Sequence, residues 1–162
     1  MAKGTIHSKS FSIVLPLFII ILVYLRLYFF IPLLFLSNTI VDPDQDTKWK
    51  NGKYHRSFIT HSVLWSVLIG LVWSFSLLEY FDLSVILLHF MKVIFVFLLP
   101  ILLHLILDVY SKSGNRTGKY CISFQNEKRL TGRLTVIWIL VNITLILLYI
   151  VGFIWLQLIG GI

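Results

Sequence analysis

Side chains that can bind a metal ion gather at three places in this otherwise apolar chain. Two aspartates follow Pro43, a histidine pair brackets residues 56–60, and a His-x-x-x-Asp motif ends the third apolar run. Together with a histidine near the N-terminus, the candidate ligands are His7, Asp44, Asp46, His55, His61, His104 and Asp108. Carboxylates and imidazoles are ligands that zinc and manganese accept in proteins. The sequence therefore predicts a site for a divalent metal ion.

The composition of the chain predicts that this site belongs to a membrane protein. Of the 162 residues, 58% are hydrophobic and 13% are charged, and the mean hydropathy is +0.90. In typical soluble domains, about a quarter of the residues are charged. Apolar runs of membrane-spanning length occupy residues 11–41, 62–81, 83–109 and 134–159. We predict an all-α, polytopic integral membrane bundle of four or five membrane segments, forming one domain over residues 1–162.

The positive charge of the chain does not indicate nucleic-acid binding. The formal net charge is +7, but the lysines and arginines cluster beside the apolar runs, which is the pattern of membrane proteins with basic cytoplasmic segments. We therefore expect membrane lipid, and no nucleic acid, as a partner. The single cysteine, Cys121, excludes an internal disulfide and a thiolate metal cluster.

The first apolar run admits two interpretations. A single helix over residues 11–41 would be about 46 Å long, well beyond a hydrocarbon core of about 30 Å. A hairpin of two short helices would turn near Arg26, with Pro32 loosening the second helix. Only the hairpin puts the N-terminus on the same side as the two basic loops, which collects 12 of the 14 basic residues there. The orientation rule favours this arrangement, with five segments and the N-terminus inside; four segments are the alternative.

The predicted ligands reach one membrane face on either topology. The first run ends before Asp44, the second begins after His61, and the third ends at the His104–Asp108 pair. Residues four apart on a helix share one face, so this pair projects together. We predict a metal site formed by loop 37–61 and helix end 104–114.

The histidines at positions 55 and 61 are too far apart to share one helix face. We expect His55 in the loop and His61 in the first turn of the next helix, with Ser57 or Thr60 as its N-cap.

These motifs resemble the bacterial families described as membrane-bound metal-dependent hydrolases. The matching segments are Gly-x-x-His at 4–7, Pro-Asp-Gln-Asp at 43–46, His-Arg-Ser-Phe-Ile-Thr-His-Ser at 55–62, and His-x-x-x-Asp at 104–108 with Ser-Gly at 113–114. Their order is similar to that of the zinc-dependent phospholipase C and nuclease superfamily, whose members are all-helical and bind a cluster of zinc ions. The chain departs from the pattern at Thr47, where a histidine is common, and it has no further His or Glu pair after Asp108. We therefore expect one or two ions, zinc foremost, with manganese or magnesium as alternatives.

The resemblance implies hydrolysis of a phosphoester or another ester. We expect this substrate to be linked to a lipid and the reaction to occur at the cytoplasmic face of a bacterial inner membrane. In that interpretation Asp42, or Asp46 where it is not a ligand, accepts a proton from water. Arg56 pairs with a phosphate group. The alternative is a non-catalytic membrane protein in which the metal joins helix ends, acting as a partner subunit or as an immunity or exclusion factor. The sequence names no protein partner.

Overall fold

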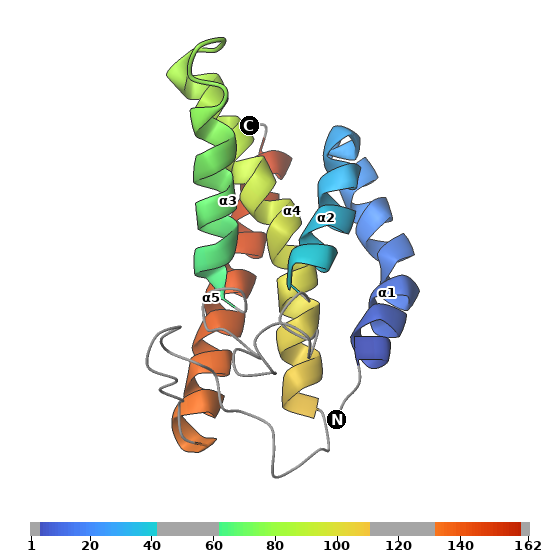
Figure 1. Cartoon of the computed structure of the whole chain (residues 1–162). Helices are drawn as coiled ribbons and strands as arrows, with labels where there is room; N and C mark the ends of the chain where they lie inside the picture. The colour runs from blue at the N-terminus through green and yellow to red at the C-terminus, as the bar shows by residue number, and fades with distance from the viewer. Residues whose placement is uncertain (1–3, 42–61, 111–131, 160–162) are drawn as a thin grey trace.

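The computed structural model describes residues 4–41, 62–110 and 132–159, and these fold into α-helices (Figure 1). No strand occurs among them, which confirms an all-α fold for this part of the chain. The elements are α1 (Gly4–Tyr24), the 3-10 helix η1 (Tyr28–Phe30), α2 (Ile31–Val41), α3 (Val63–Phe75), α4 (Leu83–Tyr110) and α5 (Gly132–Leu158).

The first apolar run is a helical hairpin. α1 ends before Arg26, and η1 and α2 then run back beside it (Figure 1). A hydrogen bond from the Leu27 amide to the Leu22 carbonyl (2.6 Å) closes the turn. The prediction of a hairpin turning near Arg26 is thus confirmed. The role predicted for Pro32 is wrong, because it lies in the first turn of α2, where its missing N–H costs no helical hydrogen bond.

The turn residue Arg26 adopts a left-handed backbone conformation, with φ of 56°. This conformation costs an L-residue about 1 kcal/mol, and glycine escapes most of that cost. We expect Arg26→Gly to raise the free energy of unfolding by about 0.5–1 kcal/mol and Arg26→Val to lower it by about 1 kcal/mol or more. Denaturant titration of the three proteins in one detergent measures the difference. Equal stability of both variants would contradict the assigned turn.

α4 is the central helix of the bundle. Of the helices that the structure describes, α1, α2, α3 and α5 all contact it, and residues 93–101 are buried without interruption. α5 is joined to α4 by a hydrogen bond from the Tyr149 hydroxyl to the Met91 carbonyl (2.8 Å) and by stacked rings of Phe95 and Phe153, 4.5 Å apart. A helix that is apolar on all sides is stable only when other apolar groups surround it. For the middle of α4, those groups are the neighbouring helices.

The described helices alternate in direction, so each helix end points toward one of two sides of the bundle. α1, α3 and α5 run upward in Figure 1, and α2 and α4 run downward. We call the end where α4 terminates the lower end. α1 and α5 begin near it, whereas α2 ends and α3 begins well above it, both pointing in its direction (Figure 1). The upper end carries the hairpin turn and the turn between α3 and α4. Every helix end that borders a predicted ligand segment therefore faces the lower end.

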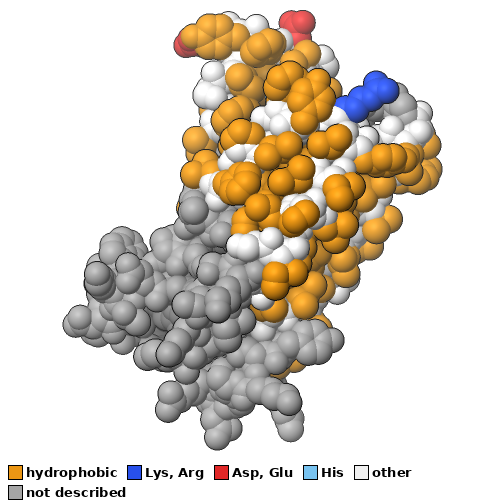
Figure 2. Space-filling view, turned by 90° about the vertical axis from the view of Figure 1, so that its right-hand side faces the viewer, with side chains coloured by type: hydrophobic (Ala, Val, Ile, Leu, Met, Phe, Trp, Pro, Cys, Tyr) orange, Lys and Arg blue, Asp and Glu red, His pale blue; other side chains and the backbone are white. Residues whose placement is uncertain are grey.

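Within the described part of the chain, two helices are long and apolar enough to cross a membrane, over Leu83–Leu107 and Val136–Leu158. Three shorter apolar helical segments accompany them, at Ser10–Tyr24, Tyr28–Ser37 and Val63–Phe75. α5 remains largely uncovered, with only 22% of its apolar window buried, whereas the core helix of a soluble protein would be mostly buried. Figure 2 shows exposed hydrophobic side chains over most of the described surface on its visible face. These features are typical of helices that face lipid.

Candidate functional site

His104 and Asp108 lie near the lower end of α4. The helix is continuous over both residues, so the backbone register puts them on one face, one turn apart, as their spacing predicts. The side chain of His104 is 6% exposed, and Ile101, three residues earlier on α4, is also buried. A buried imidazole requires a polar partner or a metal ion, since desolvation without one is costly. The side chain of Asp108 lies outside what the structure describes.

Buried polar side chains occur on several helices of the bundle. Among the described residues, the polar side chains that are buried are Ser37, Ser62, Ser66, His104 and Asn142. They come from α2, α3 and its N-cap, α4 and α5. The hydroxyls of Ser37 and Ser66 donate to carbonyls of their own helices, at 3.0 and 2.7 Å. Among the described residues, α2, α3, α4 and α5 therefore each carry a buried polar side chain or follow one, whereas the buried stretch 93–101 of α4 is apolar throughout.

The start of α3 is fixed from another helix. Val63 is the first residue of α3, and its amide donates to the side-chain Oδ1 of Asn142 on α5 (3.1 Å). Ser62 occupies the N-cap position in an extended conformation, without a capping hydrogen bond from its side chain. The prediction that Ser57 or Thr60 is the N-cap is wrong, because the helix starts later than expected. His61 accordingly precedes the N-cap rather than lying in the first turn.

Asn142 is a residue that the sequence analysis did not single out. Its side chain is 3% exposed, and its Nδ2 donates to the Trp138 carbonyl one turn earlier on α5 (2.9 Å). The signal was present in the sequence as an asparagine in the middle of an apolar run. Strongly polar residues at such depth usually bond to another helix or take part in function.

The remaining predicted site residues fall largely outside the described part of the chain. Outside it lie Asp42, Asp44, Asp46, His55, Arg56 and His61. His7 belongs to the first turn of α1, at the lower end, although its side chain is not described. Among the side chains that the structure describes, which include neither His7 nor Asp108, no three His, Cys, Asp or Glu side chains group closely enough to hold a metal ion.

One boundary of the predicted site needs correction. Residues 37–41, which were expected to begin the loop 37–61, form the end of α2. This helix stops at Val41, two residues before Pro43. A proline disfavours helical conformation in the residue before it and cannot itself continue the helical hydrogen bonding. The helix thus extends almost as far as the proline permits.

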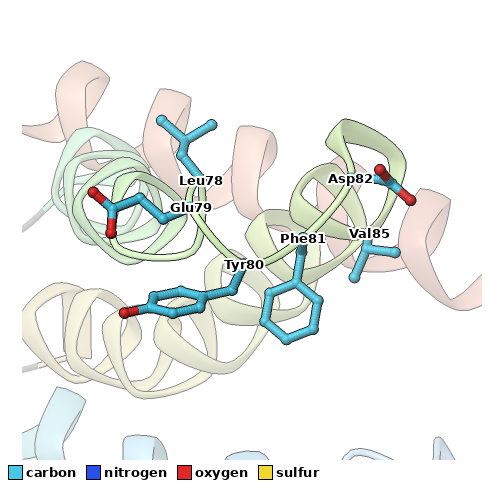
Figure 3. Close-up of a pocket in the computed structure, with 6 residues that line it drawn as sticks. All are labelled: Leu78, Glu79, Tyr80, Phe81, Asp82 and Val85. Carbon is cyan, nitrogen blue, oxygen red and sulfur yellow. The ribbon is translucent and has the colours of Figure 1, made fainter.

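The acidic residues at the upper end do not form a second site. Leu78, Glu79, Tyr80, Phe81, Asp82 and Val85 line an open hollow at the turn between α3 and α4. Figure 3 shows the carboxylates of Glu79 and Asp82 extending to opposite sides of this turn, away from each other. Tyr80 and Phe81 are exposed, as aromatic residues at a membrane–water interface are. The hollow is therefore part of an exposed turn rather than an enclosed acidic site.

His89 also belongs to the upper end. Its ring lies 5.8 Å from that of Phe30 in η1 and 6.3 Å from that of Phe81. Through these ring contacts, His89 near the start of α4 packs against η1 of the hairpin and against the turn that precedes α4. His89 is therefore remote from the lower end, where His104 lies.

The chain matches no protein-family model, no curated protein and no solved structure in these comparisons. The resemblance to membrane-bound metal-dependent hydrolases thus rests on the motifs of the sequence alone.

Proposed function

We propose that this chain is a small integral membrane protein that binds one or two divalent metal ions at its lower end and hydrolyses a phosphoester or other ester. One observation supports this most: the alternating helices bring the start of α1, the end of α2, the start of α3 and the end of α4 to the same side of the bundle (Figure 1). His7, His104 and Asp108 belong to α1 and α4, and the other four predicted ligands belong to the segment that joins α2 to α3 in the sequence. Ligands from distant segments must converge in this way to form one metal site.

The residues of the proposed site have separate roles. His7, Asp44, Asp46, His55, His61, His104 and Asp108 would supply nitrogen and oxygen ligands, which suit zinc and also manganese or magnesium. A bound divalent ion would lower the pKa of water and polarise a phosphoryl or ester oxygen. Asp42 would accept the proton that the attacking water gives up. Arg56 would hold a phosphate oxygen through paired N–H donors.

We further propose that the lower end faces the cytoplasm in a bacterial inner membrane. In the sequence, the basic segments around residues 3–9, 48–56 and 112–133 include or adjoin the start of α1, the end of α2, the start of α3, the end of α4 and the start of α5, and basic segments prefer the cytoplasmic side. α2 has 11 residues and is about 16 Å long, half of what a membrane crossing requires. The α1–α2 hairpin would thus enter and leave on the cytoplasmic side. A substrate reaching the site from this interface would be lipid-linked.

Turnover of model esters tests the catalytic part of the proposal. We expect the purified, zinc-loaded protein to hydrolyse a phosphodiester or a phospholipid, and Asp108→Ala to reduce the rate at least about 100-fold because a metal ligand is lost. Asp82→Ala, which removes a carboxylate at the upper end, should leave the rate unchanged. Zinc bound by the wild-type protein without turnover of any ester would reject the enzyme and favour a metal-stabilised, non-catalytic subunit.

A further inference from the structure

We infer that Asn142 is a positioning residue of the proposed metal site, acting on His61 through the start of α3. The inference rests on the proposed function, which makes His61 a ligand. Its structural basis is the contact between the Asn142 side chain and the Val63 amide, which joins residues 79 positions apart in the chain.

The amide group of Asn142 can satisfy its partners in one orientation only. Oδ1 accepts from the Val63 amide at 3.1 Å, and Nδ2 donates to the Trp138 carbonyl at 2.9 Å. Turning the amide over would set a donor against a donor and an acceptor against an acceptor. Because the side chain is only 3% exposed, bulk water is not at hand to replace either partner. The acceptor is therefore held toward α3.

Asn142 supplies an acceptor for the first amide of α3, which has none within its own helix. The first amides of a helix have no intrahelical acceptor, and the Ser62 side chain does not cap α3. In the same turn, the Ser62 carbonyl accepts from the Trp65 amide at 3.2 Å. Asn142 thus fixes the residue at which α3 begins, from a helix that packs against α4.

His61 is two residues before Val63 in the sequence. Two residues of extended chain span at most about 7 Å, so the anchored amide limits where the His61 backbone can lie. Removing the acceptor would free the first turn of α3 to fray and would loosen that limit. Outer partners that orient metal ligands usually contribute 10- to 100-fold to metal affinity.

Zinc affinity in a double-mutant cycle tests this role. We expect Asn142→Leu, which keeps a similar volume but has no acceptor, to weaken zinc binding about 10-fold or more. Asn142→Asp retains an acceptor and should weaken it less, and Thr144→Val, at an exposed position of α5, should not weaken it. In a His61→Ala background the effect of Asn142→Leu should largely disappear, because its target is gone. An equal effect of Asn142→Leu with and without His61 would overturn the inference, since that is what general destabilisation produces.

A spin label tests the same contact without metal. In a Cys121→Ser background, a nitroxide attached after His61→Cys should become more mobile when Asn142→Leu is added, and stay unchanged with Thr144→Val. Unchanged mobility with Asn142→Leu would overturn the inference even if zinc binds. A wild-type protein that binds no zinc, together with a label that responds to Asn142→Leu, would instead reject the proposed function and retain Asn142 as the anchor of α3.

Discussion

Replacing His104 with alanine is expected to weaken zinc binding by at least about 100-fold, more than the loss of an outer partner would. His104 is a buried imidazole on the central helix, one turn before Asp108 and on the same face of α4. A site with three or four ligands loses much of its affinity when one is removed. Competition with a chromophoric chelator in detergent measures the change, and His104→Gln controls for the cavity that alanine leaves.

His89 provides a matched control for this experiment. It lies on the same helix, but its ring contacts Phe30 and Phe81 at the upper end. His89→Ala should therefore leave zinc affinity within about twofold of wild type, although it removes packing around the ring. If both substitutions weaken zinc binding equally, the effect comes from the stability of the bundle rather than from a lower-end site.

Replacing Gly70 with leucine is expected to destabilise the bundle by about 3 kcal/mol, which is among the larger free-energy costs of overpacking a core. A Cβ atom at this position would lie 2.9 Å from Cδ2 of Phe90 and 3.0 Å from Cγ1 of Ile94. Both residues belong to α4, which contacts α3 more extensively than any other pair of helices contact each other. At Gly70, α3 therefore packs directly on side chains of the central helix without room for a Cβ, a close approach that small residues allow in membrane bundles.

Gly152 offers the opposite case within the same protein. Nothing lies within 4 Å of a Cβ built on this residue of α5. Gly152→Leu should be neutral or should stabilise the helix by up to about 1 kcal/mol, because glycine has poor helix propensity. Unfolding of the two variants in SDS-containing mixed micelles, followed by circular dichroism, measures the contrast. Similar destabilisation by both substitutions would contradict the assigned packing of α3 on α4.

Much of the helical architecture could be predicted from the sequence. Hydropathy located the long helices, and the distribution of lysine and arginine selected the hairpin that turns at Arg26. The spacing of His104 and Asp108 predicted their common face on α4. Each of these predictions depends on local periodicity or on charge, which a sequence carries without knowledge of tertiary contacts.

The central position of α4 could not be predicted. Helices surrounded by lipid and helices surrounded by protein are both apolar, so composition does not separate α4 from the uncovered α5. The start of α3 was missed for a related reason. Its first amide bonds to Asn142, far along the chain, and local capping rules that pointed to Ser57 or Thr60 cannot anticipate such a partner. The hydrogen bond from the Val63 amide to the Asn142 side chain depends on how α3 and α5 pack, which local sequence does not show.

X-ray absorption spectroscopy at the zinc edge, combined with metal analysis, tests the metal site most directly. The protein purified in detergent and reloaded with zinc is predicted to hold one or two ions per chain, bound by nitrogen and oxygen at about 2.0–2.1 Å with imidazole scattering and no sulfur. Asp108→Ala should lose this signal, while Asp82→Ala should keep it. Protein that retains no zinc after loading, or zinc held by sulfur at about 2.3 Å, would contradict a histidine–aspartate site at the lower end.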